Sequence, residues 1–190
     1  MTPELIAQCT GGTLANARVY AVPLTDAMAL FQINTPRRQS AFLATVGIES
    51  ARLTAVEESL YYRDAGRLAS IYPRAFDNAE EARPYTRNSE ALGKLLYQGY
   101  CGRGLIQLTW EKNYRAAGEA LGKPYLAQPN MVKEPVDAAL TAAWFWSANG
   151  CNKPADALDM TGVTRIVNGA RLMHLAERVA LYDGGMVALA

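Results

Sequence analysis

The sequence predicts a mainly α-helical fold, a single domain over residues 1–190 with one small β element. Half of the composition is apolar, which is enough for one compact hydrophobic core. Apolar residues recur at helical spacing along most of the chain, whereas only Leu105–Thr109 alternates between apolar and polar side chains. No repeat, linker or low-complexity segment divides the chain, so we expect no separate wall-binding or other accessory domain.

The N-terminal third is predicted to be helical. Thr2 followed by Pro3 is typical of a helix start, and Thr35 followed by Pro36 starts another helix. Between them, apolar residues at 24, 27, 28 and 31 follow the i, i+3, i+4, i+7 spacing of one buried helix face. The chain therefore begins with a series of packed helices.

The C-terminal third shows the same pattern. Val136–Ser147 is apolar nearly all round, as expected of a central helix that others enclose. Another helix is predicted to close at Asn168 and Gly169, and the last one, carrying Leu175–Tyr182, to end before Gly184 and Gly185. These glycines are read here as helix terminators.

The β element is predicted at Leu105–Thr109, which follows two glycines at 102 and 104. Ile106 and Leu108 would face the core, while Gln107 and Thr109 would stand side by side on the opposite face. The glycines would let the backbone approach a ligand closely, so this element is a candidate cleft wall. Thr109 also fits the N-cap of the following helix, a role that is compatible with the first.

Composition excludes several functional classes. Nineteen basic and eighteen acidic residues give a net charge of +1, so no basic surface for nucleic acid or for a membrane is expected. Cys9, Cys101 and Cys151 lack zinc-site spacing and suit a reducing compartment, although a Cys101–Cys151 bridge is an alternative. The only histidine, His174, has no second ligand at metal spacing. We therefore predict neither a metal nor a cofactor.

Glu49 is the first candidate catalytic residue. In the helix that starts at Thr35, it shares a stripe with Phe42, Thr45 and Val46 and so emerges on the face predicted to be buried. Burial in apolar surroundings raises the pKa of a carboxyl group, and a general acid needs a carboxyl that keeps its proton near neutral pH. The alternative is a glutamate paired with an arginine at a helix end.

Glu58 is the second candidate, nine residues further on. Continuous helix would rotate it by about half a turn and displace it by roughly 13 Å from Glu49, so a shared site requires the helix to break between them. Residues 54–60 fit an extended return that would bring Glu58 to face Glu49 across a groove. Two carboxyl groups in unlike settings are what glycosidic bond cleavage requires. Glu57 is the alternative second acid, with its side chain pointing away from that of Glu58.

A family resemblance extends over nearly the whole chain, up to Tyr182. The segments that carry it, in order, are AFLATVGIES, EESLYY, GRGLIQLT, NYRAAGEAL, AAWFWSANG and VTRIVNG. In this order and spacing they resemble the glycoside hydrolase family 19 module of bacteriophage endolysins, relatives of plant-type chitinases. The resemblance implies a lysozyme-like, mostly α fold with a small β element at the substrate cleft, and an inverting hydrolase.

The resemblance also implies roles for single residues. Glu49 would protonate the leaving oxygen as general acid, and Glu58 would activate water as general base. Thr109 would help to hold that water, and an arginine at position 178 would stand beside the acid. The residues implied to bind sugar hydroxyl and acetamido groups are Gln107, Asn113 and Asn168.

Each of these residues also has a structural alternative. Asn168 fits a helix C-cap, Asn113 fits packing of the next helix, and Arg178 fits a surface ion pair with Glu177 or Asp183. Tyr62 is a candidate for stacking on a sugar ring and equally a core residue with one wet edge.

The sequence also departs from the family. Ile48 stands where the family has histidine, and Ala51 with Arg52 replace a glycine pair, which predicts a different turn after the acid. Only QGYC connects the preceding segment to the GRG element, where phage relatives carry a long loop, so one cleft wall is expected to be lower.

These observations predict an endolysin, a monomer that hydrolyses β-1,4 glycosidic bonds of bacterial peptidoglycan as a muramidase does. Its partner would be the wall polysaccharide, without nucleic acid or stable membrane insertion. No secretion signal is visible in the sequence. We therefore expect accumulation in the host cytoplasm and release to the wall when a holin opens the inner membrane. The alternatives are a chitinase, a lytic transglycosylase, or a catalytically impaired wall-binding module.

Overall fold

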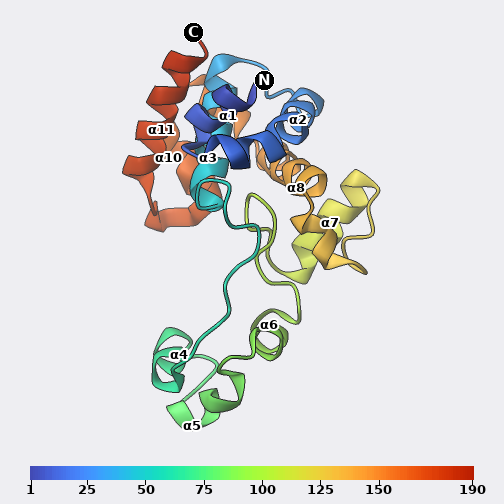
Figure 1. Cartoon of the computed structure of the whole chain (residues 1–190), viewed down its shortest axis with the longest axis vertical. Helices are drawn as coiled ribbons and strands as arrows, with labels where there is room; N and C mark the ends of the chain where they lie inside the picture. Colours follow the sequence, from blue (N-terminus) through green and yellow to red (C-terminus); the bar gives the residue numbers. More distant parts are fainter.

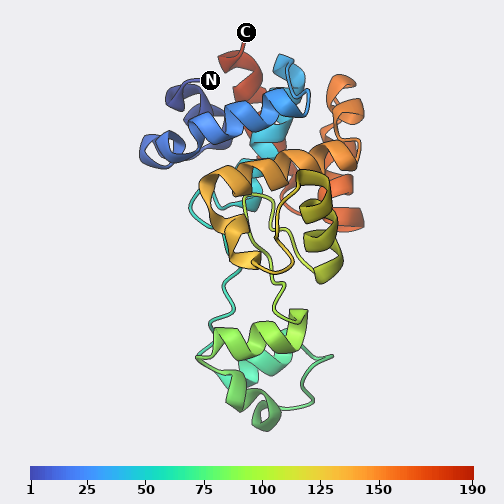
Figure 2. The same ribbon diagram turned by 90° about the vertical axis from the view of Figure 1, so that its right-hand side faces the viewer.

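The computed structural model describes residues 1–190, and it shows a large and a small helical lobe joined by two extended chain segments (Figures 1 and 2). The large lobe contains α1 (Pro3–Thr10), α2 (Leu14–Leu30), α3 (Pro36–Glu49), α7 (Glu111–Leu121), η2 (Pro129–Lys133), α8 (Pro135–Ala148), α9 (Asn152–Asp156), α10 (Met160–Asn168), η3 (Gly169–Arg171) and α11 (Leu175–Ala188). The small lobe contains α4 (Ala65–Ile71), α5 (Ala79–Ala82), η1 (Arg83–Tyr85) and α6 (Ser89–Tyr97). The mainly helical, lysozyme-like fold class predicted from the sequence is confirmed.

The predicted helix starts at Thr2 and Thr35 are confirmed. Each threonine is an N-cap whose hydroxyl accepts a hydrogen bond from a backbone N–H of the first turn, and each is followed by proline at the first helical position. The predicted end at Asn168 is also confirmed, because Gly169 adopts a positive φ of 71° directly after it.

The predicted end of the last helix is wrong. α11 continues through Gly184 and Gly185 to Ala188. Gly185 is buried against α3, where a Cβ atom would collide with the Ser40 hydroxyl, and that hydroxyl donates to the carbonyl of Tyr182 at 2.6 Å. This glycine therefore allows two helices to pack closely instead of terminating one.

The central helix is α3, whereas the sequence predicted the segment at Val136–Ser147. Every residue from Ser40 to Gly47 is buried, and the helix packs against α1, α9 and α11. α8 does contribute a buried face, but its Val136 side chain is 54% exposed. Apolar composition alone does not distinguish a helix enclosed on all sides from one that leaves an apolar residue in solvent.

The break between Glu49 and Glu58 lies directly after α3. The helix ends at Glu49, and Ala51, Arg52 and Leu53 all have left-handed φ angles of 47°, 63° and 65°. Ala51 and Arg52 are the positions where the sequence departs from a glycine pair, so the turn is made by residues for which this conformation has a steric cost. The Ser50 hydroxyl supports the turn by accepting a hydrogen bond from the Leu53 N–H at 3.0 Å. The extended return, predicted over residues 54–60, then follows over residues 55–62.

The predicted β element is smaller than a strand. Arg103 forms isolated antiparallel bridges with Glu57 and with Leu108, and the residues between Arg103 and Leu108 make a tight turn. Gln107 has a φ of 54°, which no strand residue adopts. The predicted facing is nevertheless confirmed, because Ile106 and Leu108 are buried while Gln107 and Thr109 are partly exposed.

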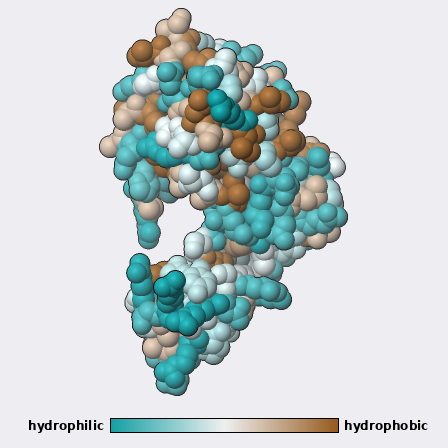
Figure 3. All heavy atoms as spheres, in the orientation of Figure 1, coloured by the Kyte–Doolittle hydropathy of each residue, from teal (hydrophilic) through white to brown (hydrophobic).

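The small lobe was not predicted from the sequence. Its three α-helices are short, and each begins at an Asp or Asn whose side chain accepts a backbone N–H, namely Asp64, Asn78 and Asn88. A separate cluster of six buried residues holds it together: Leu60, Leu68, Phe76, Ala82, Leu92 and Cys101. Figure 3 shows an open recess between the two lobes on one side of the molecule.

Two further features limit the chemistry of the chain. All three cysteines are free and buried, so the alternative of a Cys101–Cys151 bridge is wrong, and Cys151 belongs to the core of the large lobe. No helix combines the length and the apolar character that crossing a membrane would require.

Candidate active site

Glu49 lies at the last position of α3, where the buried helix reaches the recess between the lobes. The guanidinium of Arg178 on α11 contacts Glu49 Oε1, and the Asn168 amide donates to the same oxygen at 2.9 Å. Arg178 is completely buried, while 16% of the Glu49 side chain is exposed. The predicted apolar setting is therefore wrong, because a buried cation holds one carboxylate oxygen.

The other oxygen, Glu49 Oε2, has no hydrogen-bond partner in the protein. The carboxyl group lines a cavity of about 220 Å³ together with residues 106–109 of the predicted cleft wall and with Asn113 of α7. Phe145 and Val167 complete the apolar part of this cavity. One oxygen is thus fixed by α10 and α11, and the other is available to a group that enters the cavity.

Gln107 and Thr109 form the wall of this cavity, as the sequence predicted. The Gln107 amide donates to the Gly104 carbonyl at 3.1 Å, and the Thr109 hydroxyl donates to the Gln107 carbonyl at 2.7 Å. Asn113 donates to the Thr109 carbonyl at 2.7 Å. These bonds occupy donors, so the side-chain amide oxygens of Gln107 and Asn113 and the lone pairs of the Thr109 hydroxyl are left to accept hydrogen bonds.

Thr109 is not the N-cap of the following helix. That position belongs to Trp110, which has a φ of 76° and makes no side-chain capping bond. Gly102 lies close to the side chains of Gln107 and Thr109, because a Cβ atom there would be 2.9 Å from Gln107 Oε1 and 3.3 Å from Thr109 Oγ1. The sequence predicted a close approach of the glycine backbone to a ligand; in the structure the Gly102 backbone lies close to the Gln107 and Thr109 side chains.

Glu58 lies on the first of the two extended segments that join the lobes. Its Oε1 accepts a hydrogen bond from the Tyr97 hydroxyl at 3.0 Å, and its Oε2 accepts a long one of 3.5 Å from the Gly102 N–H. Glu58 lines a different cavity, of about 670 Å³, and is absent from the lining of the Glu49 cavity. Gly102 separates it from Gln107 and Thr109.

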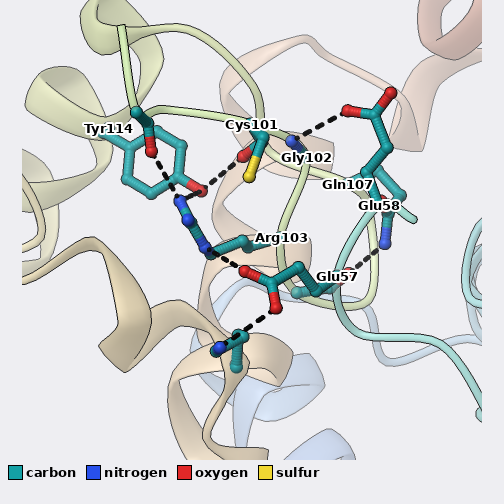
Figure 4. A network of polar contacts seen from close by, with 10 residues as sticks. Glu57, Glu58, Cys101, Gly102, Arg103, Gln107 and Tyr114 are labelled. Carbon is teal, nitrogen blue, oxygen red and sulfur yellow. Dashed lines mark hydrogen bonds and ion pairs between the residues drawn. The ribbon is translucent and has the colours of Figure 1, made fainter. Parts of the chain in front are cut away.

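Glu57 points the opposite way, as predicted for an extended segment (Figure 4). Its two oxygens accept hydrogen bonds from Arg103 at 2.9 Å and from Lys133 at 3.1 Å. Burial opposes ionisation of Glu57, but these two donors outweigh it and lower the pKa of this carboxyl group. A carboxylate held by two cations is a poor proton acceptor, which favours Glu58 over Glu57 as the base.

Arg103 and Tyr97 were not predicted as functional residues. Arg103 links both extended segments, because it contacts Glu57, the Gly99 carbonyl at 3.0 Å and the Tyr114 hydroxyl at 3.2 Å (Figure 4). In the sequence, the one feature that could have indicated a role for Arg103 is its place between Gly102 and Gly104. Tyr97 gives no such signal, because its contact with Glu58 joins residues 39 positions apart.

Tyr62 does not join the Glu49 cavity. Its hydroxyl lies 3.3 Å from that of Tyr72, its ring packs edge-on against the Tyr72 ring, and it lines a separate cavity of about 370 Å³ on the small lobe. Arg178 is a buried partner of Glu49, so the alternative of a surface ion pair with Glu177 or Asp183 is wrong. His174 contacts Glu177 at 3.4 Å, and no group of three His, Cys, Asp or Glu side chains is placed to hold a metal ion.

The arrangement combines one carboxyl group fixed in the large lobe, a second on the inter-lobe segment, and acceptor groups on the wall between them. Asn168, Arg178, Gln107, Thr109 and Asn113 are brought together around Glu49, while Glu58 stands next to them across Gly102 and Tyr62 stands apart. Two carboxyl groups on either side of a cleft can act as acid and base in the cleavage of an acetal.

Comparison with known proteins identifies the family of the chain. Residues 37–170 match the family model of class I chitinases, glycoside hydrolase family 19. A Haemophilus influenzae protein described as containing a glycosyl hydrolase family 19 domain is 32% identical over 165 residues, 79% of each chain. An Arabidopsis thaliana endochitinase is 44% identical over 73 residues, but these cover only 25% of its length and 38% of this chain.

Solved structures show the same relationship. Chitinase C of Streptomyces griseus superposes with a TM-score of 0.69 at 25% identity, over 98% of this chain and 90% of that one. Another bacterial family 19 chitinase superposes with a TM-score of 0.66 at 26% identity, over 98% of this chain and 93% of that one. The family match covers more than half of the chain and the Haemophilus relative most of it. The chain therefore belongs to glycoside hydrolase family 19 and is a chitinase-like glycosidase.

Proposed function

We propose that this protein is an endolysin that hydrolyses the β-1,4 glycosidic bonds of bacterial peptidoglycan, between N-acetylmuramic acid and N-acetylglucosamine, with inversion at the anomeric carbon. The observation that carries the hydrolytic part is the setting of Glu49. Its Oε1 is held by Arg178 and Asn168, and its Oε2 faces a cavity whose wall presents hydrogen-bond acceptors. This setting supports Glu49 Oε2 as the oxygen that protonates a glycosidic oxygen.

Glu49 acts as the general acid in this proposal. When the bond between the anomeric carbon and the leaving oxygen breaks, the leaving oxygen takes the proton from Glu49 Oε2. Arg178 and Asn168 then face the newly formed carboxylate through Oε1 and stabilise its charge. Because α3, α10 and α11 pack together in the large lobe, these partners are in place before substrate arrives.

Glu58 acts as the general base. It takes a proton from a water molecule, whose oxygen bonds to the anomeric carbon on the face opposite to the leaving group. The Thr109 hydroxyl already donates to Gln107, so it is oriented to accept a hydrogen bond from this water. Because Glu58 lies on the inter-lobe segment, we propose that approach of the small lobe toward the large lobe brings water and sugar into line.

Gln107, Asn113 and Asn168 bind the sugar in this proposal. The side-chain amide oxygens of Gln107 and Asn113 accept no hydrogen bond from the protein and suit sugar hydroxyl and acetamido N–H donors. Asn168 stands at the boundary between Glu49 and the sugar, since its amide nitrogen bonds the acid. All three line or adjoin one cavity, as a row of subsites requires.

The test is product analysis after digestion of purified peptidoglycan sacculi. The proposal predicts new reducing ends at N-acetylmuramic acid, released with inverted anomeric configuration. Reducing ends at N-acetylglucosamine, retention of configuration, or 1,6-anhydro ends from a transglycosylase would each contradict it. Binding to sacculi without any release of ends would identify an impaired wall-binding module instead.

Hydrolysis of chitin is the second candidate, because the named relatives and solved structures are chitinases. N-acetylglucosamine oligomers digested beside the sacculi separate the two substrates. We also propose that the protein reaches the wall as a monomer after a holin opens the inner membrane. Expression in a bacterial host with and without a holin tests this, with lysis expected only in the presence of both proteins.

A further inference from the structure

A groove of about 770 Å³ lies between the lobes and is distinct from the cavities that contain Glu49 and Glu58. Residues 71–75, at and after the end of α4, and Leu95 and Leu96 of α6 form its floor on the small lobe. Arg171 of η3, on the large lobe, also lines it. In Figure 1 the segment between α10 and α11 faces α4 across the opening, and Figure 3 shows hydrophilic side chains reaching into this opening from both lobes.

The groove adjoins both halves of the candidate active site. Arg171 is the last residue of the short 3₁₀ helix η3, which directly follows Asn168. The Asn168 side chain donates a hydrogen bond to Glu49. On the floor, the Tyr72 hydroxyl lies 3.3 Å from that of Tyr62, and Leu96 directly precedes Tyr97, the residue that donates to Glu58. One wall of the groove therefore lies next to Asn168, the partner of Glu49, and the other next to Tyr97, the partner of Glu58, so the groove offers a continuation to a polymer bound at the two carboxyl groups.

The charge of the groove has one sign. Its only charged side chains are Arg74 and Arg171, and neither forms an ion pair with a carboxylate of the protein. Five of the eight lining residues are apolar. Two guanidinium groups above an apolar floor suit a ligand that combines carboxylates with small apolar groups, because arginine binds carboxylates in a planar, two-pronged geometry.

We propose that this groove is a specificity site for the stem peptide of peptidoglycan, with Arg74 and Arg171 binding its carboxylates and the floor packing against its alanine methyl groups. This inference rests on the proposed function, and it adds a reason for the choice of polymer. Chitin is uncharged and offers the two arginines no partner, whereas every uncrosslinked stem peptide carries free carboxylates. The arginines therefore act on substrate binding and leave the chemical step to the acids.

The experiment measures initial rates on native sacculi at subsaturating concentration for wild type, Arg74→Ala, Arg171→Ala and the double variant. Exposed pairs are modest in strength, so we expect a loss of about threefold for each arginine and about tenfold for both, in KM rather than kcat. Arg83→Ala is the matched control, because Arg83 is an exposed arginine of the same lobe outside the groove. Unchanged rates for the double variant would overturn the proposal.

A second set of substrates tests the same inference without any variant. Wild type is expected to lose about tenfold on sacculi whose peptide carboxylates have been converted to neutral amides, and the double variant should lose nothing further there. On N-acetylglucosamine oligomers both proteins should act equally. An equal loss on the oligomers, or full wild-type activity on the amidated sacculi, would contradict carboxylate recognition.

The source of the carboxylate is tested with sacculi from which an amidase has removed the stem peptides, leaving a free lactyl carboxylate on each muramic acid. Wild type should lose its advantage over the double variant on this material. An advantage that persists would overturn the stem peptide as the ligand and assign the lactyl group. Failure of the proposed function looks different, because wild type would then release no ends from any sacculi while it cleaves chitin oligomers.

Discussion

The two carboxyl groups of the candidate active site lie in regions of very different construction. Glu49 ends a helix whose residues Ser40–Gly47 are all buried, and its partner Arg178 is fully buried on a second helix of the same core. Glu58 lies on an extended segment, and its strongest contact is the hydroxyl of Tyr97 from a lobe with only six buried core residues. The proposed acid, Glu49, is fixed by the large core, whereas the position of the proposed base, Glu58, depends on a small lobe.

This difference shows which part of the molecule positions each of the two proposed catalytic carboxyl groups. Helix packing sets Glu49 relative to its partners whether or not substrate is present, while the two inter-lobe segments set Glu58. The Glu57–Arg103–Lys133 network ties these segments together at their base. Variants at the acid should therefore change chemistry on an intact scaffold, and variants around the base should change alignment.

The largest expected effect comes from Glu49→Gln. The amide keeps an oxygen for Arg178 and Asn168 but cannot deliver a proton, so kcat on sacculi should fall on the order of 10²- to 10⁴-fold. Glu111→Gln is the control, because Glu111 is a partly exposed glutamate that pairs only with Arg115. Lysis of permeabilised bacteria by Glu49→Gln at the wild-type rate would reject Glu49 as the acid.

Arg178→Ala should have the largest effect on stability. It leaves the partly buried Glu49 carboxylate without its cation and empties the volume of a large buried side chain, so the free energy of unfolding should fall by about 3 kcal/mol. Arg38→Ala removes a partly exposed ion pair with Asp156 and should cost about 1 kcal/mol or less. Denaturant unfolding of both variants measures the comparison, and equal losses would show that burial of Arg178 is unimportant.

Glu58→Gln should reduce kcat on the order of 10²-fold, because an amide cannot accept the proton of the attacking water. Glu57→Gln should keep most of the activity, since the Glu57 oxygens are occupied by Arg103 and Lys133. Steady-state rates of the two variants on sacculi decide between adjacent residues that the sequence alone barely separates. The reverse order of effects would assign the base to Glu57.

Local signals were enough to predict the scaffold of the acid. The N-cap threonines, the proline after each and the stripe that ends at Glu49 are short-range patterns, and the structure confirms the helices they predict. The facing of Ile106 and Leu108 also follows from alternation within five residues. Family membership was predictable for a similar reason, since it is carried by contiguous segments.

Features set by long-range packing were not predictable in the same way. Gly184 and Gly185 look like a helix end, yet Gly185 lies inside α11 because α3 packs against it. Burial of Arg178 requires α3, α10 and α11 to meet, and no pattern near residue 178 indicates this. The small lobe escaped prediction because its helices are too short to show apolar periodicity, and only their capping residues mark them.

The Glu57 network should also make stability depend on pH. Because the pKa of Glu57 is lowered in the folded protein, ionised Glu57 stabilises the fold above its unfolded pKa of about 4.3, and this contribution is lost as pH falls through the folded value. Wild type should exceed Glu57→Gln by at most about 1 kcal/mol at pH 7, since 40% of this side chain is exposed. Thermal melts should show the difference closing below about pH 4, and a gap that widens toward acid pH would contradict this.

The smallest effect tests the alignment of the base. Tyr97→Phe keeps the ring contact with Trp110, at 5.1 Å between centroids, and removes only the hydroxyl that donates to Glu58. We expect kcat to fall about threefold to tenfold with KM unchanged, the range of one hydrogen bond to a charged group. Tyr100→Phe, which removes a hydroxyl bonded to the Leu126 carbonyl, is the control. An equal loss of kcat in Tyr97→Phe and Tyr100→Phe would show that the Tyr97 hydroxyl does not orient Glu58.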